Sequence, residues 1–218
     1  MTEMSFFKPK ERRDKILFVA TEAAPFIKAG GLGEVMFALP RALRRLGYDA
    51  RVMAPRYAGV DLEKFPLEME IEGLAVPTGN RGDEREKPAE LICNVKRYTP
   101  KRENGSRSSV PAYFLENLEY YENRSNTYGY SDDAIRWVLL CRGTVEFLRR
   151  SSWVPDVIVA SDWQMGFLPN YLRTVYGDDD RLRGIATVFM IHNLYYQGMF
   201  DHRFVSEMDY DDGFSPLP

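Results

Sequence analysis

Short apolar runs alternate with stretches of helical periodicity along most of this chain. The continuous apolar runs are typical of strands that are covered on both faces, and they lie at residues 16–20, 50–54, 112–115, 156–160 and 185–191. Apolar residues at helical spacing predict helices between them, at residues 35–46, 131–150 and 164–176. This alternation predicts an α/β fold with a doubly wound, mostly parallel sheet.

The first predicted helix carries its apolar residues at the spacing of one buried face. These residues are Val35, Ala38, Leu39, Ala42, Leu43 and Leu46. Gly47 follows them as a C-cap, because helices often end at a glycine in the left-handed conformation.

The pattern changes between residues 57 and 111. Residues 67–71 alternate apolar and polar side chains, residues 90–98 are a second strand candidate, and the turn-rich segment 77–83 separates them. This arrangement predicts a β-hairpin inserted into the parallel sheet.

The chain divides into three parts by sequence character. Residues 1–14 are charged and lack periodicity, which predicts a flexible tail. Residues 15–200 hold the strands and helices of one domain, and residues 201–218 read as a linker.

A lysine- and glycine-containing loop joins the first strand to the first helix. Residues 21–35 read T-E-A-A-P-F-I-K-A-G-G-L-G-E-V. Free N–H groups and the positive dipole end favour an anion at such a helix N-terminus. Gly30 and Gly31 allow the backbone to approach a ligand closely, and Lys28 supplies a charge for phosphate. We therefore predict a phosphate-containing ligand here, with a solvated surface loop as the alternative.

Two common glycine-rich motifs do not fit this loop. In a P-loop the lysine follows the glycines, whereas Lys28 precedes them. The dinucleotide fingerprint requires a third glycine where Met36 stands, and an acidic residue after the second strand, where Pro55 and Arg56 stand. An NAD-type site is therefore not predicted.

Polar residues follow four of the predicted strands. Because the carboxyl ends of parallel strands share one edge of a sheet, these residues predict one ligand-binding crevice. Ser161 directly follows a core strand, so we expect its side chain to face that crevice. The residues predicted to line the crevice are Lys28, Asp162, Trp163, His192 and Asn193.

Three of the candidate site residues have ordinary structural alternatives. Asp162 could cap the helix that follows it. Trp163 could belong to the core, where its N–H would need a partner. Glu34 lies in the first turn of the first helix and could serve only to complement the helix dipole.

The segment after the last strand carries a second group of candidates. A histidine after a buried strand is often a satisfied core histidine, but His192 is followed by the amides of Asn193 and Gln197. Together these side chains favour binding of sugar hydroxyls. Tyr196 adds an aromatic face that could stack on a glucose ring.

Composition narrows the class of partner. The chain has 218 residues, of which 44% are hydrophobic and 28% charged, as in a globular protein. No apolar run approaches the ~18 residues of a membrane span, so no membrane partner is predicted. The net charge of −3 gives no broad attraction to nucleic acid. Charges near the N-terminus, where a signal peptide needs apolar residues, predict a cytoplasmic location.

Cysteine and histidine usage argues against a metal site. Cys93 and Cys141 lie far apart in sequence and are predicted to be reduced, buried thiols. His192 and His202 are the only histidines, so neither a structural zinc site nor a histidine-rich metal site is expected.

Several motifs together resemble the N-terminal half of bacterial glycogen synthases and plant starch synthases. The resemblance covers nearly the whole chain, in the family's order and spacing. The motifs are T-E-x-x-P (residues 21–25), K-x-G-G-L (28–32), Y-S-D-D-A-I-R-W (130–137), P-D-V-I-V-A-S-D-W-Q (155–164) and I-H-N-L-Y-Y-Q-G-M-F (191–200).

This resemblance implies one half of a retaining glucosyltransferase of the GT-B type, which has two Rossmann-like domains and an active site between them. Such enzymes transfer glucose from ADP-glucose or UDP-glucose to an α-1,4-glucan, with no metal or other cofactor. The resemblance implies that Lys28, with Gly30 and Gly31, contacts the sugar nucleotide. It also implies that residues 192–198 line the cleft near the sugar and the glucan.

One motif departs from the family pattern. The family shows H-x-H-D-W-H, and this chain reads V-A-S-D-W-Q at residues 159–164. Ser161 therefore stands where the family places the histidine that faces the reacting sugar, and the catalytic residue of this chain is unknown.

The resemblance further implies that the chain is the acceptor-side half of a synthase whose C-terminal domain is absent, and which is inactive alone. Two other readings stay open. One is a non-catalytic glucan-binding or regulatory half-synthase, and the other is a different GT-B glucosyltransferase that makes sucrose or a glycolipid headgroup.

Overall fold

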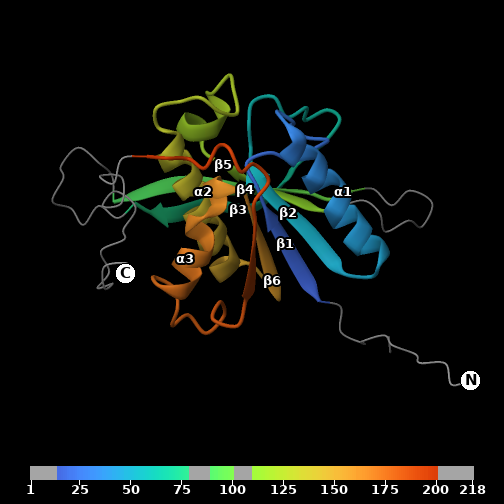
Figure 1. Cartoon of the computed structure of the whole chain (residues 1–218), viewed down its shortest axis with the longest axis vertical. Coiled ribbons are helices and arrows are strands. Elements are labelled where there is room, and N and C mark those ends of the chain that lie inside the picture. The colour runs from blue at the N-terminus through green and yellow to red at the C-terminus, as the bar shows by residue number, and fades with distance from the viewer. Residues whose placement is uncertain (1–13, 79–88, 101–109, 201–218) are drawn as a thin grey trace, which may run out of the picture.

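A seven-stranded sheet in the order β3-β4-β5-β2-β1-β6-β7 forms the centre of the computed structural model, which describes residues 14–78, 89–100 and 110–200 (Figure 1). Five of its strands are parallel neighbours. They are β1 (Lys15–Val19), β2 (Asp49–Pro55), β5 (Ala112–Glu116), β6 (Val157–Ser161) and β7 (Ala186–Met190). The predicted α/β class and mostly parallel sheet are confirmed.

Helices cover both faces of this sheet. Figure 1 shows α1 (Gly31–Arg45) on one side, and α2 (Asp133–Arg150) and α3 (Phe167–Arg173) on the other. Two short helical segments, η1 (Leu118–Glu122) and η2 (Trp163–Met165), complete the elements. The chain runs outward from β1 to β2 and β5, and then returns to β6 and β7 on the other side of β1. The fold is therefore doubly wound, and the order reverses between β1 and β6.

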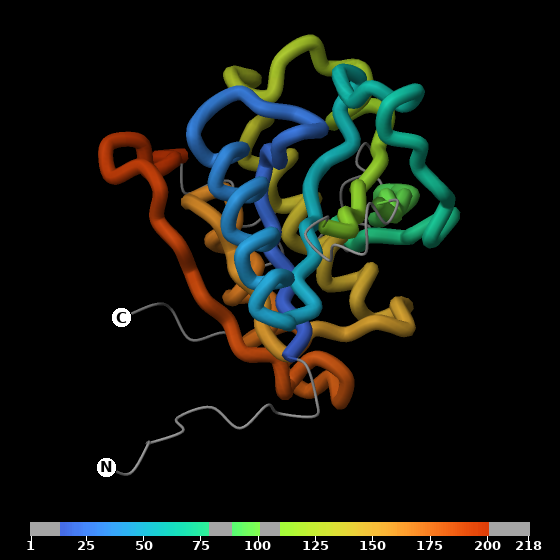
Figure 2. The backbone as a smooth tube through the Cα atoms, turned by 90° about the vertical axis from the view of Figure 1, so that its right-hand side faces the viewer, coloured from blue at the N-terminus to red at the C-terminus, as the bar shows by residue number. Residues whose placement is uncertain are grey.

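Alternate residues of β1 belong to the two cores on either side of the sheet. Phe18 packs in the core under α1, and Leu17 and Val19 pack in the core under α2 and α3. Figure 2 shows α1 lying across the face of the sheet. The buried part of β1 is therefore continuously apolar, because both of its faces are covered.

The predicted apolar stripe of α1 is correct in part, because Val35, Leu39 and Leu43 pack against the core whereas Ala38, Ala42 and Leu46 are exposed. The helix begins at Gly31, and its buried residues are Leu32, Gly33, Met36 and Pro40. Leu46, which was expected to face inward, is 76% exposed. Leu32, Met36, Leu39 and Leu43 recur at close to the helical period, so the observed stripe shares its second half with the predicted one. The C-cap of α1 is Leu46, and Gly47 follows it with a φ of +100°, the left-handed conformation predicted for the glycine that ends this helix.

The predicted hairpin insertion is confirmed. β3 (Glu68–Pro77) pairs antiparallel with β4 (Glu90–Tyr98), and β4 pairs antiparallel with β5. Two register shifts in β3 interrupt its ladder. The insertion thus extends one edge of the sheet, away from β6 and β7.

The predicted helix at residues 164–176 is shorter in the structure. It is divided between η2 and α3, and α3 ends at Arg173. Pro169 falls in the first turn of α3, where its missing N–H would have no intrahelical partner. Most of the predicted tail at residues 1–14, and all of the predicted linker at 201–218, lie outside the described residues.

Both cysteines are buried free thiols, as predicted. Burial raises the pKa of the Cys93 thiol to about 12, and it also raises the pKa of the Cys141 thiol. Within the part of the chain that the structure describes, no helix is both long and apolar enough to cross a bilayer.

Candidate functional site

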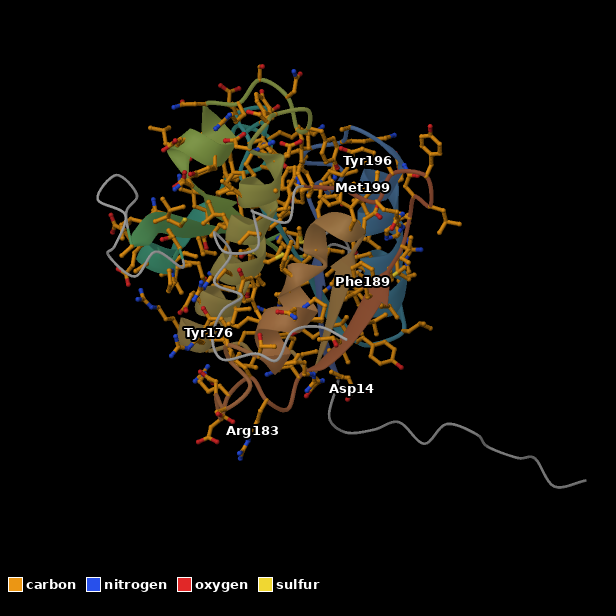
Figure 3. All side chains as sticks on the ribbon, turned by 60° about the vertical axis from the view of Figure 1, so that its left-hand side comes forward. Asp14, Tyr176, Arg183, Phe189, Tyr196 and Met199 are labelled. Atoms are coloured by element: carbon orange, nitrogen blue, oxygen red, sulfur yellow. The ribbon has the colours of Figure 1, made fainter. Side chains whose placement is uncertain are left out.

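The loops that follow the carboxyl ends of the parallel strands hold the predicted site residues. The loop after β1 and the segment after β7 both lie at this end of the sheet (Figures 1 and 2). Figure 3 shows Tyr196 and Met199 at the end of the molecule away from Asp14, which precedes β1. Two groups of side chains form there, one around Glu22 and one around Trp163.

Glu22 fills the loop that was predicted to bind an anion. Its Oε2 accepts hydrogen bonds from the N–H groups of Ala29 and Gly30, at 2.6 and 2.8 Å. Its Oε1 accepts the hydroxyl of Tyr128 at 3.0 Å. The residue is only 2% exposed. An internal carboxylate thus occupies two of the N–H groups in front of α1.

Tyr128 connects this carboxylate to the end of β1. Because its hydroxyl donates to Glu22, the Thr21 hydroxyl, 2.7 Å away, donates to Tyr128. Burial raises the pKa of the Tyr128 phenol, and the negative charges of Glu22 and Asp162 raise it further. Asp162 therefore lies close enough to this group to act on it electrostatically.

Lys28 lies at the open side of the loop. Its Nζ forms an ion pair with Oε1 of Glu34 at 2.6 Å, and the two side chains are 50% and 56% exposed. Exposed pairs of this kind contribute only about 0.2–1 kcal/mol, so a phosphate can compete for the lysine. A Cβ added at Gly31 would meet no atom within 4 Å, which leaves its backbone open to a ligand.

Gly33 belongs to the same group, although the sequence reasoning did not single it out. A Cβ there would lie 3.0 Å from Oε2 of Glu22 and 3.3 Å from Cγ of Lys28. Glycine at this position therefore leaves room for the buried carboxylate. Gly33 is the third glycine of G-G-L-G in the sequence. Its role could be recognised only once the position of the Glu22 side chain was known.

Asp162 has an unusual backbone at the start of η2. Its φ of 68° and ψ of 174° fall in a region that is almost restricted to glycine. Its Oδ1 accepts the N–H of Trp163 at 3.1 Å, which fits the capping alternative. Its own N–H donates to the carbonyl of Met190 at 2.7 Å, joining the ends of β6 and β7. Strain of this kind costs about 1–3 kcal/mol and is found most often at functional sites.

The expectation that Ser161 faces the crevice is wrong. Ser161 is the last residue of β6, is 0% exposed, and donates from Oγ to Sδ of Met36 at 3.8 Å. The strand continues one residue further than predicted. Because side chains alternate along a strand, Ser161 lies on the same face as Val159, toward α1. The position of the family histidine is therefore buried here.

Trp163 carries the second group of side chains. Its ring meets that of Tyr196 edge to face at 5.7 Å and lies 5.4 Å from that of Phe200. A Cβ at Gly198, whose φ is +64°, would lie 2.0 Å from the Trp163 ring. The half-buried indole also packs against the main core. Trp163 therefore contributes to the core, as the structural alternative expected, and also contacts the candidate site residue Tyr196.

The polar side chains after β7 differ in whether they already form hydrogen bonds within the chain. Asn193 accepts the N–H groups of Tyr195 and Tyr196 on Oδ1, at 2.9 and 3.2 Å, and Gln197 donates to the carbonyl of Asn193. These amides therefore shape the turn. Nε2 of His192 is buried and has no hydrogen-bond partner among the described residues. A buried orphan of this kind calls for a partner from outside the chain.

The structure thus joins the predicted residues in two groups. Lys28 and Glu34 lie with the glycines and Glu22, and Trp163 lies with Tyr196 and the turn after β7. No hydrogen bond joins Lys28 to His192 in the described part of the chain. The same part of the chain holds no group of three or more acidic, histidine or cysteine side chains that could bind a metal ion.

Comparison with known proteins gives consistent matches. The family model described as starch synthase catalytic domain matches residues 15–216. Glycogen synthase from Geobacillus stearothermophilus is 39% identical over 199 residues, which is 91% of this chain and 38% of that protein. Glycogen synthase from Geotalea uraniireducens (strain Rf4) is 36% identical over 205 residues, covering 92% of this chain and 39% of that protein.

A solved structure has the same fold. The catalytic domain of starch synthase IV from Arabidopsis thaliana, bound to ADP and acarbose, matches with a TM-score of 0.71 and 23% identity. The match covers 85% of this chain and 35% of that one. The chain therefore spans less than two-fifths of the length of these relatives.

Proposed function

Because this chain belongs to the starch synthase catalytic domain family, we propose that it is the acceptor-side half of a retaining GT-B glucosyltransferase. The proposed reaction transfers glucose from ADP-glucose or UDP-glucose to an α-1,4-glucan. The Arabidopsis neighbour was solved with ADP bound, and this supports a nucleotide diphosphate as the ligand class.

The exposed Lys28 beside the open backbone of Gly31 carries this proposal. Lys28 is held only by a solvent-screened pair with Glu34, at the N-terminus of the 15-residue helix α1. A positive charge and a helix dipole there would stabilise the negative charge that develops on a diphosphate leaving group. Lys28 is thus assigned to the phosphates, and Glu34 exchanges its partner when the donor binds.

The second group of side chains is assigned to the sugars. Nε2 of His192 takes a glucose hydroxyl as its missing partner. Tyr196, which is 57% exposed, offers the face of its ring to a glucan while its contact with Trp163 holds it in place. Asn193 and Gln197 set the turn that presents both residues.

The remaining donor contacts are proposed to come from a C-terminal domain of the kind that makes the relatives longer. The edge strand β7 supports an interface with further polypeptide, because Val188 and Phe189 are 46% and 45% exposed while β1 and β6 are largely buried. Ile191, just after β7, is 53% exposed and extends this apolar edge.

A non-catalytic glucan-binding half-synthase is the second candidate. The observation that favours it is Ser161, a buried serine at the position of the family histidine. In this candidate, a serine buried against α1 makes no contact with the sugar that the family histidine would face. Both candidates bind an α-1,4-glucan, but only the first transfers glucose to it.

A chimera separates the candidates. In it, this chain replaces the matching segment of the Geobacillus stearothermophilus glycogen synthase. We expect the chimera to incorporate labelled glucose from ADP-glucose into glycogen, and Lys28→Ala to abolish the incorporation. We expect the chain alone to transfer none. A folded chimera that binds glycogen but transfers no glucose would favour the glucan-binding candidate.

A further inference from the structure

Glu22 is buried, and none of the roles given above accounts for its carboxyl group. Three groups donate to its carboxylate: the N–H groups of Ala29 and Gly30, and the Tyr128 hydroxyl. A carboxylate suits this place because it offers two acceptor oxygens and no donor. Its two oxygens therefore tie the loop before α1 to Tyr128, which lies 106 residues away from Glu22 in sequence.

The geometry of the loop depends on this carboxylate. Ala29 and Gly30 separate Lys28 from the first residue of α1, so fixing their N–H groups fixes both the lysine and Gly31. A Cβ at Gly33 would lie only 3.0 Å from Oε2 of Glu22. The first turn of α1 therefore packs closely against the same carboxylate oxygen. Charge-assisted hydrogen bonds of this kind are about twice as strong as neutral ones.

We propose that Glu22 is a positioning residue for the sugar-nucleotide site, acting as a built-in anion that takes the N–H groups of Ala29 and Gly30. The donor's phosphates are thereby directed outward, to Lys28 and the open backbone of Gly31. This inference rests on the proposed function, because it assigns the donor to the same loop. Glu22 itself does not touch the donor.

The test uses the ¹⁵N-labelled chain, its Glu22→Ala variant, and ADP-glucose and UDP-glucose as probes. In Glu22→Ala the amide protons of Ala29 and Gly30 should shift and exchange with solvent about tenfold faster or more, because their acceptor is gone. Free acetate should reverse these changes by supplying a carboxylate. Glu63→Ala removes an exposed acid elsewhere and should leave both amides unchanged.

Affinity for the nucleotide distinguishes positioning from mere support of the fold. We expect Glu22→Ala to weaken binding of the preferred donor by about tenfold and acetate to restore it, with the melting temperature measured in parallel. Glu22→Gln keeps an oxygen for the two amides but removes the charge and places an NH₂ donor in the site, so its affinity should lie between those of the wild-type chain and Glu22→Ala. If Glu22→Ala does not fold, Gly33→Ala displaces the same oxygen and should reproduce the loss.

The outcomes separate this inference from the function on which it rests. Unchanged amides in Glu22→Ala or Gly33→Ala would overturn the role of Glu22. Shifted amides with wild-type affinity would overturn positioning and leave the proposed function standing. A third outcome is that the amides shift in Glu22→Ala but the wild-type chain itself binds neither nucleotide. That outcome would overturn the proposed donor site and, with it, the positioning role.

Discussion

The rings of Trp163 and Tyr196 meet edge to face with 5.7 Å between their centroids. One ring follows β6 and the other follows β7, so the contact brings the ends of two parallel strands together. Gly198 makes this possible, because any side chain there would overlap the indole. The segment after β7 is therefore held on the edge of the sheet by an aromatic contact.

Gly198→Ala should destabilise the chain by at least about 2 kcal/mol. The substitution combines a positive φ of +64° with a Cβ only 2.0 Å from the Trp163 ring. Chemical denaturation followed by tryptophan fluorescence measures the loss. Gly184→Ala is the matched control, because a Cβ there would meet nothing within 4 Å. Equal stability of the two variants would contradict the contact.

Asp162→Gly should be more stable than Asp162→Ala by about 1–3 kcal/mol. Both substitutions remove the hydrogen bond to the N–H of Trp163, but only glycine relaxes at a φ of 68° and a ψ of 174°. The comparison of the two unfolding free energies therefore isolates the backbone strain. An alanine variant as stable as the glycine variant would show that Asp162 is unstrained.

Ser161→His should destabilise the chain by about 1–3 kcal/mol, since it forces a larger polar ring into a packed site. Ser161 is fully buried against Met36. Ser161→Ala, which keeps the volume small, should have a much smaller effect in the same thermal unfolding experiment. A histidine variant with wild-type stability would mean that this position opens toward the crevice.

Asp49 should make stability depend on pH in the acidic range. Partial burial raises the pKa of this carboxyl, but hydrogen bonds from Arg51 and Trp153 and the charges of Arg51 and Arg44 outweigh it and hold the pKa below 3.8. A lowered folded-state pKa stabilises the fold above the unfolded value, and this contribution is lost as the pH falls through the folded one.

Asp49→Asn should therefore cost about 1 kcal/mol or more at neutral pH, and the cost should shrink as the pH falls through the lowered folded-state pKa of Asp49. Unfolding free energies of both chains across that range measure the difference. Glu119→Gln removes an exposed acid and serves as the control. A difference that does not change with pH would exclude the lowered pKa.

The sequence allowed the sheet to be predicted because its strands are continuous apolar runs, as at β1, where both faces are covered. It also allowed Trp163 and Tyr196 to be placed at one end of the sheet. The buried stripe of α1 was predicted only in part, because the apolar pattern was read from Val35 whereas the helix begins at Gly31 and buries Leu32.

Glu22 and Ser161 show the same limit at the site. The role of Glu22 depends on Tyr128, more than a hundred residues away, and no local pattern reports that distance. Ser161 is buried because it is the last residue of β6 and lies on the same face as Val159, under α1, where its hydroxyl contacts Met36. Strand boundaries of this accuracy are not encoded in apolar runs alone.

The proposed donor site at the loop before α1 is tested most directly by titrating the ¹⁵N-labelled chain with ADP-glucose and UDP-glucose. Because this chain spans less than two-fifths of the length of its relatives, we expect a dissociation constant near 1 mM as an order of magnitude, with the largest shifts at Gly30 and Gly31. Lys28→Ala should weaken binding by about tenfold or more, whereas Lys64→Ala should not. Shifts confined to a distant face, or equal affinities of wild-type and Lys28→Ala chains, would contradict the proposed site.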